Sequence, residues 1–241
     1  MKAQYGMAIG VVFLVTGIAS AALAQTQSGA ASDLAAYRAR YGKAEMGISC
    51  TEAAKAPFER GLLLLHSFAW ADARKGFQEA AQADPNCAMA YWGVAMSYYD
   101  GLHEHPSAPE VEEARAALAQ ARVANAATER ERAYVAAAEH IFRGYPQAER
   151  RDRDRAYSQA MAEIHRAYPQ DREAAIFHAL SMLSLARRGV ENGNELQKQA
   201  TEIMEPLFRE LPDHPGVAHY LIHDYDDAPQ LAHLRGGRPV G

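Results

Sequence analysis

Apolar residues recur every three or four positions through most of the chain, which is the spacing of one face of an α-helix. Alternation with a period of two residues and runs of β-branched residues are nearly absent. Alanine and other strong helix formers fill the periodic segments. The pattern therefore predicts an all-α protein.

Prolines interrupt this helical pattern at regular places. Asp84-Pro85-Asn86, Tyr145-Pro146, Tyr168-Pro169-Gln170-Asp171 and Leu211-Pro212-Asp213-His214-Pro215 each fall between two helical segments. Because proline cannot continue a helix interior, these positions predict short turns that join successive helices.

One arrangement of small and large apolar residues recurs, and in three of its four copies a proline follows. The spacing puts the apolar residues of each copy on one helix face. The four copies are Ala73, Phe77, Ala80 with Pro85; Ala114, Leu118, Ala121; Tyr157, Met161, Ile164 with Pro169; and Ala200, Met204, Leu207 with Pro212.

With Gly61 upstream of the first copy and Tyr91, Ala95 and Tyr98 in the next unit, this pattern resembles the tetratricopeptide-repeat family. The stretches at residues 61–68, 84–93 and 219–227 resemble an exported bacterial subgroup of unknown biochemical role. The resemblance covers residues 52–227. It implies a right-handed superhelical solenoid of stacked helical hairpins with a concave groove.

On this division of the chain, residues 25–51 form an N-terminal extension and residues 228–241 an irregular tail. The tail has no apolar helical period, and members of the family continue further. We therefore expect a truncated or frameshifted end.

In tetratricopeptide hairpins the first helix of each pair lines the concave face, where a peptide or protein would bind. The resemblance places six residues on that face: Phe58, His66, Met89, Trp92, Met96 and Tyr99. Large aromatic side chains are effective binding anchors. The alternative is that they pack inside the helical core, as Met and Trp commonly do.

Residues 1–24 have the features of a secretory signal. Lys2 precedes an uncharged apolar run from Met7 to Ala24, and Ala22-Leu23-Ala24 is a small-x-small cleavage pattern. An uncleaved membrane anchor is the alternative. Cleavage predicts a periplasmic or secreted protein without stable membrane insertion.

Loss of Lys2 with the signal changes the formal net charge from −5 to −6, which does not favour nucleic-acid binding. Export would place Cys50 and Cys87 in an oxidising compartment, where they can form a disulfide. Two separate buried thiols are the alternative. The segment Arg143–Arg155 is highly charged, and we expect it to be a solvated turn.

Histidine is frequent, with ten residues in the chain. His219 and His223 are four residues apart, so a helix would bring both imidazoles to one face, where they could share zinc or copper. Asp226 could add an oxygen ligand, and His103 and His105 form a second pair on an expected loop. Two ligands alone do not make a site, because zinc takes three or four protein ligands.

No nucleophile elbow, phosphate-binding loop, dinucleotide-binding turn or His-Glu-x-x-His motif occurs. We therefore expect an exported scaffold that binds a protein or peptide and has no catalysis of its own. Our alternative hypothesis is a periplasmic protein that binds zinc or copper through histidines.

Overall fold

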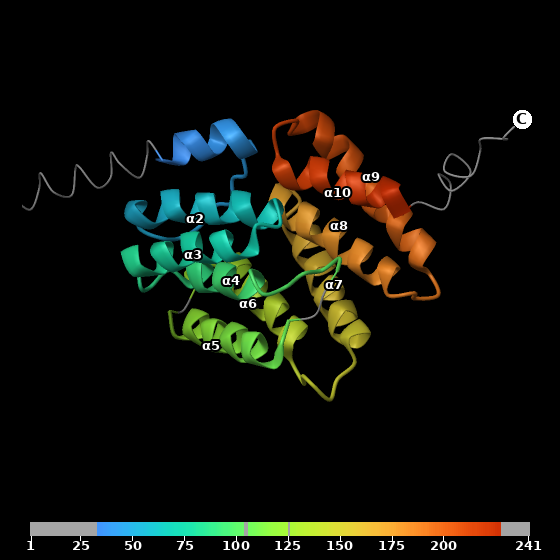
Figure 1. Cartoon of the computed structure of the whole chain (residues 1–241), viewed down its shortest axis with the longest axis horizontal. Coiled ribbons are helices and arrows are strands. Elements are labelled where there is room, and N and C mark those ends of the chain that lie inside the picture. The colour runs from blue at the N-terminus through green and yellow to red at the C-terminus, as the bar shows by residue number, and fades with distance from the viewer. Residues whose placement is uncertain (1–32, 104–105, 125, 228–241) are drawn as a thin grey trace, which may run out of the picture.

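The computed structural model describes residues 33–103, 106–124 and 126–227 (Figure 1). The expected signal at 1–24 and the tail at 228–241 lie outside them. Every regular element within the described ranges is a helix, so the prediction of an all-α protein is confirmed. None of these helices is long and apolar enough to cross a membrane.

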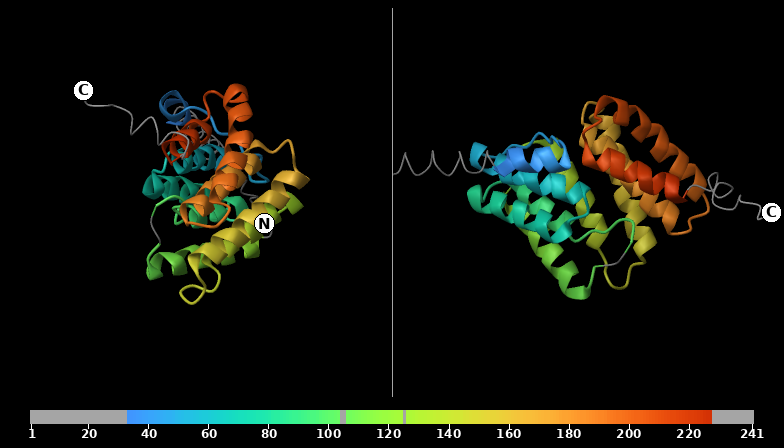
Figure 2. Two further views of the ribbon diagram at one scale, coloured as in Figure 1. Left: turned by 90° about the vertical axis from the view of Figure 1, so that its right-hand side faces the viewer. Right: turned by 45° about the horizontal axis from the view of Figure 1, so that its top comes forward.

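Within the described residues, nine helices follow a first helix at residues 33–41. In chain order they are α2 (Glu52–His66), α3 (Trp70–Ala83), α4 (Ala88–Met96), α5 (Ala108–Ala124), α6 (Glu129–Phe142), α7 (Arg150–Ala167), α8 (Arg172–Arg187), α9 (Gly193–Glu210) and α10 (Pro215–Asp227). Neighbours in the sequence pack as hairpins: α2 with α3, α4 with α5, α6 with α7, and α8 with α9 (Figures 1 and 2).

The helix ends follow local sequence rules. Thr128 and Glu131 form a reciprocal capping box at the start of α6, and the Asp171 side chain accepts the Ala174 N–H (3.2 Å) at the start of α8. Helices α3, α7 and α9 each end two residues before a proline, at Pro85, Pro169 and Pro212. The prolines therefore mark turns as expected.

The second helix of each hairpin contributes the recurring apolar face to the core. All twelve of its predicted residues are buried: Ala73, Phe77, Ala80, Ala114, Leu118, Ala121, Tyr157, Met161, Ile164, Ala200, Met204 and Leu207. The sequence period alone therefore identified the packed face of α3, α5, α7 and α9.

Glycine allows α2 and α3 to approach closely. A Cβ at Gly76 would lie 2.8 Å from the backbone nitrogen of Gly61, and a Cβ at Gly61 would lie 2.9 Å from the Phe77 ring. This contact explains the small residue at position 61, since a larger side chain there would separate the two helices.

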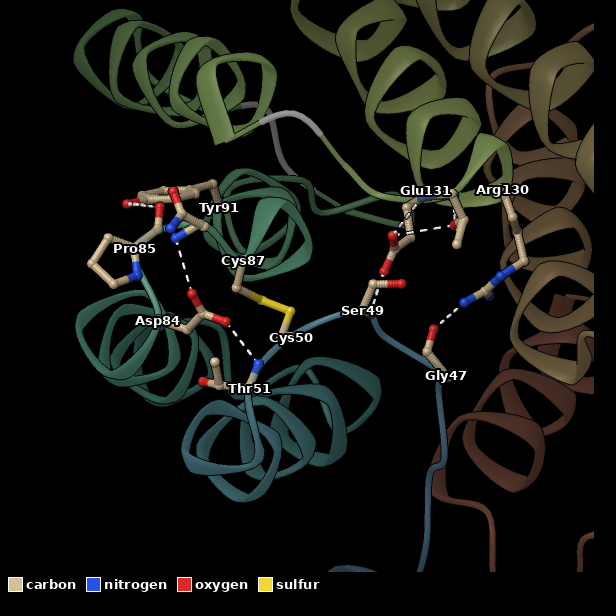
Figure 3. Close-up of a disulfide and its surroundings, with 12 residues drawn as sticks. Gly47, Ser49, Cys50, Thr51, Asp84, Pro85, Cys87, Tyr91, Arg130 and Glu131 are labelled. Atoms are coloured by element: carbon tan, nitrogen blue, oxygen red, sulfur yellow. Dashed lines mark hydrogen bonds between the residues drawn. A yellow bond between two sulfur atoms is a disulfide. The ribbon is translucent and has the colours of Figure 1, made fainter. Parts of the chain in front are cut away.

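A disulfide fixes the segment that leads into α2. Cys50 is bonded to Cys87 at the start of α4, as expected, and no described cysteine is free (Figure 3). On either side of it, the Thr51 N–H donates to Asp84 (2.7 Å) and the Ser49 N–H donates to Glu131 (2.6 Å). The segment is therefore attached to α3, α4 and α6.

The last helix returns to the first hairpin. Helix α10 packs on α9 but also contacts α8 and α2. In an open array of repeats each unit contacts only its sequence neighbours. The contact between α10 and α2 therefore brings the last described helix back to the first hairpin (Figure 1).

The charged segment differs from the expectation of a solvated turn. Residues 150–155 form the start of α7, and Arg150, Arg153 and Asp154 are buried. Arg150 Nε lies 3.3 Å from Asp154 Oδ2, and Arg153 donates to the Ile141 and Ala148 carbonyls (2.8 and 2.7 Å). Residues 143–149 do form a mostly exposed turn, so the expectation was wrong only for residues 150–155, where three charged side chains are buried and paired inside the fold.

Gly76→Ala should destabilise the protein by about 1–3 kcal/mol, because the added Cβ meets backbone of α2 that cannot move independently. The gain in helix propensity, about 1 kcal/mol, should not offset this overpacking. Urea denaturation measures the change. Gly47→Ala is the control, since its Cβ would be 3.6 Å from the nearest atom. Equal stability of both variants would contradict the close contact.

Candidate functional site

The six residues expected to line a peptide groove are core residues. Phe58, His66, Met89, Trp92, Met96 and Tyr99 are each 4% exposed or less. Trp92, for example, makes edge-to-face contacts with Tyr134 and Phe177 at centroid distances of 5.7 and 5.5 Å. The groove assignment was wrong for these residues, because helices packed from several sides bury the faces that an open solenoid would expose.

Two groups of histidines lie where α10 meets α2 and α8. The first group is buried and has Glu173, in the first turn of α8, at its centre. His66 Nε2 lies 2.8 Å from Glu173 Oε2, and His214 Nε2 lies 2.9 Å from Glu173 Oε1. One ligand atom from each residue lies within 4.8 Å of the others, so the group is a geometric candidate for a metal ion.

The outer nitrogens of these two imidazoles determine which tautomer each adopts. The backbone N–H of Val217 can only donate, and it lies 3.4 Å from His214 Nδ1. His214 Nδ1 therefore accepts, and the ring proton is on Nε2, directed at Glu173. His66 Nε2 faces the Glu173 carboxylate, which can only accept when ionised, so Nε2 carries the proton and Nδ1 accepts from the Tyr220 hydroxyl 2.9 Å away.

This buried group is therefore a closed hydrogen-bond network. Two ring N–H groups donate to the two oxygens of one ionised carboxylate, and the other ring nitrogens accept from Tyr220 and Val217. A metal would have to replace both Nε2 protons. We interpret the network as a structural link between α2, α8 and α10.

The charge states agree with this interpretation. Burial would raise the pKa of Glu173, but interaction with His66 and His214, which donate to both of its oxygens, outweighs burial and lowers the pKa to about 2. Burial lowers the pKa of His66 more than Glu173 raises it, which favours the neutral ring. Burial also raises the pKa of Tyr220, so its hydroxyl remains a donor.

The second histidine group is half-buried on α10. His219 Nε2 and His223 Nε2 are 3.1 Å apart, so the predicted i, i+4 pair shares one face of the helix. His219 Nδ1 lies 2.9 Å from the main-chain oxygen of His66, the last residue of α2. A carbonyl can only accept, so Nδ1 carries the proton and Nε2 of neutral His219 carries the lone pair.

His103 belongs to the same group. Its ring centroid lies 5.5 Å from that of His223, and its Nδ1 lies 3.3 Å from Asp100 Oδ1. Donation to the carboxylate leaves Nε2 as the lone-pair nitrogen. A second nitrogen bonded to a carbonyl or carboxylate is the usual arrangement of a histidine that binds a metal.

Phe68 packs in the middle of this group. Its ring centroid lies 4.2 Å from that of His219, 5.7 Å from that of His223 and 6.1 Å from that of His103. Phe68 has φ +58°, a left-handed conformation that costs a non-glycine residue about 1–2 kcal/mol. A glycine would fit this position after α2 better, so the side chain itself has a role here.

A cavity of about 420 Å³ opens beside His223. Its walls come from α8, α9, α10 and the segment after α4: Leu102, Leu183, Ala186, Arg187, Arg188, Gly193, Asn194, Gln197 and His223. The second histidine group therefore borders space that a small molecule can enter, whereas the first group is enclosed.

The sequence found only part of this site. His103, His219 and His223 come together as hypothesised, whereas His105 and the side chain of Asp226 lie outside the described residues. Glu173, His214 and Phe68 could not be predicted as site residues, because nothing in their local sequence indicates that α8 and α10 meet the end of α2.

No protein-family model matches this chain, and neither a curated protein nor a solved structure matches it significantly.

Glu173→Gln should destabilise the protein by about 2–4 kcal/mol at pH 7, because an amide cannot accept from both imidazoles and leaves one buried donor unpaired. The lowered pKa of Glu173 gives wild type stability that is complete above pH about 4.5 and is lost as pH falls towards 2. The variant should lack this dependence on pH.

Urea denaturation at pH 7 and at several values between pH 5 and pH 3 tests this. Glu163→Gln is the matched control, because Glu163 is exposed on α7 and the substitution changes the same charge. If both variants lose the same stability and keep the same pH profile, the buried network does not stabilise the fold.

Proposed function

We propose that this protein binds one transition-metal ion through His219 and His223, with His103 as the third ligand. The observation that carries the proposal is the 3.1 Å distance between the two Nε2 atoms of His219 and His223. Two ligands about 2.0–2.1 Å from a zinc ion can be this close to each other. A proton now shared between the nitrogens would leave when both lone pairs bind the metal.

The orientation of the rings favours this group over the buried one. The main chain of His66 holds His219 with Nε2 available, and Asp100 does the same for His103. His214, by contrast, directs a proton at Glu173. His103 is exposed on a loop, so rotation of its side chain can bring Nε2 towards the pair. Three imidazoles suit zinc or copper.

Three histidine ligands leave a coordination position for water or another small ligand. The cavity beside His223 is on the side where such a ligand can enter. This arrangement supports a metal-binding role.

We also propose that the hairpins are tetratricopeptide-like repeats and that the protein is exported. The buried second-helix faces and the Gly61 contact support the first statement. The Cys50–Cys87 disulfide supports the second, since such bonds persist in oxidising compartments.

Elemental analysis of protein purified without chelator or histidine tag tests the metal proposal. We expect about one zinc or copper ion per chain, as three histidines and one open position require. His219→Ala with His223→Ala should abolish binding.

The control is His165→Ala with His178→Ala. These two histidines also face each other, on α7 and α8, with their Nδ1 atoms 3.3 Å apart. This double variant should keep the metal. A metal-free wild-type protein, or loss of metal only in the control, would contradict the proposal.

The second candidate function is that of a protein-binding scaffold. It is supported by an exposed surface other than the groove that the sequence predicted. Phe208, Ile222 and Tyr225 are 44%, 59% and 40% exposed, and they surround an apolar hollow of about 390 Å³ on α9 and α10. An exposed apolar face of this kind commonly marks a protein interaction surface. A second copy of this chain would be a suitable partner.

Sedimentation equilibrium over a range of protein concentrations tests this candidate. We expect self-association that Ile222→Asp weakens at least tenfold, because a buried carboxylate without a partner opposes the contact. Val123→Asp, at an exposed apolar residue of α5, should associate like wild type. A monomer at every concentration would exclude self-association through this face.

A further inference from the structure

The cavity between α8 and α9 is lined by positively charged side chains that have no role in the metal proposal. Arg187 and Arg188, at the end of α8, are among its nine lining residues, and none of the nine is a carboxylate. Asn194, Gln197 and His223 add polar groups to the same wall. A cavity of this composition favours an anionic ligand.

Two nearby carboxylates, those of Asp154 and Asp100, are engaged inside the protein. Asp154 accepts from Arg150 (Nε to Oδ2, 3.3 Å), and the same oxygen lies 3.7 Å from Arg188 Nε. Two guanidinium groups therefore share one carboxylate. Asp100 accepts the main-chain N–H groups of Leu102 and His103 (3.1 and 3.0 Å) in addition to the His103 ring contact.

Arg188 has hydrogen-bonding capacity left over. Its Nη2 donates to the Gly101 carbonyl (3.0 Å), which holds the side chain against the segment after α4. Its Nε–H is buried and has no hydrogen-bond acceptor among the described residues, because Asp154 is too distant. Buried donors are normally satisfied, so a small movement of the Arg188 side chain that turns this N–H towards an acceptor oxygen in the cavity would be favourable.

Helix α9 begins at the same wall. Gly193 and Asn194 are its first two residues, and the Asn192 side chain does not cap it. The partial positive charge of a helix start adds to that of the arginines. The metal proposal does not explain why two arginines and a helix start line this cavity, because their positive charge does not favour a cation.

We infer that this cavity binds a small oxyanion, either a dicarboxylate or a phosphate, through Arg187 and Arg188. Its volume of about 420 Å³ is within the range of small-molecule sites. The inference does not depend on the metal, because the arginines can hold the ligand alone. A bound metal would lie at the end of the cavity where His223 is.

Isothermal titration calorimetry with malonate and with inorganic phosphate, on chelator-treated wild-type protein at low ionic strength, tests the inference. Saturable binding of one ion per chain is expected, and the tighter probe identifies the class of ligand. Arg187→Gln and Arg188→Gln should each weaken binding about tenfold or more, as expected for loss of a charge-assisted hydrogen bond.

Lys198→Gln is the matched control, because Lys198 is an exposed cation of α9 that pairs with Glu202. It should bind like wild type. Since Arg188 also contacts Asp154, its variant is first checked by circular dichroism, and Arg187→Gln provides an independent test if it unfolds. Absence of saturable binding of both probes, or unchanged affinity in the Arg187 variant, would overturn the inference.

His219→Ala separates this inference from the metal proposal. It removes a proposed metal ligand that is not among the cavity-lining residues. The chelator-treated variant should therefore bind the oxyanion like wild type. Loss of metal with retained oxyanion binding supports both proposals, whereas loss of oxyanion binding would show that the arginines are not sufficient.

Discussion

The carboxylate of Glu173 lies between the imidazoles of His66 and His214, and the arrangement of the helices depends on this contact. It joins the end of α2, the start of α8 and the turn into α10. A buried carboxylate is costly unless it is fully hydrogen-bonded, and here two ring N–H groups satisfy it. The same contact requires a glycine at position 216, because a Cβ there would lie 2.5 Å from His66 Nδ1.

His66 connects the buried network to the open histidine group. Its side chain donates to Glu173, while its main-chain oxygen accepts from His219. The carbonyl is available because the last carbonyls of a helix have no partner within that helix. The end of α2 therefore orients His219 through its main chain, and Phe68, two residues later, packs on the ring.

Local patterns predicted the helices well and their assembly poorly. The recurring apolar face and the prolines identified α3, α5, α7 and α9, because these signals depend on residues close in sequence. The same reasoning placed Trp92 and Tyr99 in a groove, although both are core residues. The first helices of the hairpins, such as α2 and α4, are buried by α6, α8 and α10, which lie far along the chain. The apolar period within one helix does not reveal those contacts.

In the candidate site, too, contacts between residues close in sequence could be predicted and contacts between distant residues could not. The spacing of His219 and His223 was sufficient to predict that their nitrogens meet, since four residues make one turn of a helix. Glu173 and His214 are separated by 41 residues, and His66 and Tyr220 by 154. Only the closed arrangement of the helices brings these residues together.

The return of α10 to α2 also limits how this protein can change in length. An open repeat array can gain or lose a unit, because every interface is a copy of the next. Here an additional hairpin between α3 and α8 would carry His214 and Tyr220 away from His66, and both ends would lose their buried partners. A change in the number of hairpins between α2 and α10 would therefore have to preserve these buried contacts between the two ends.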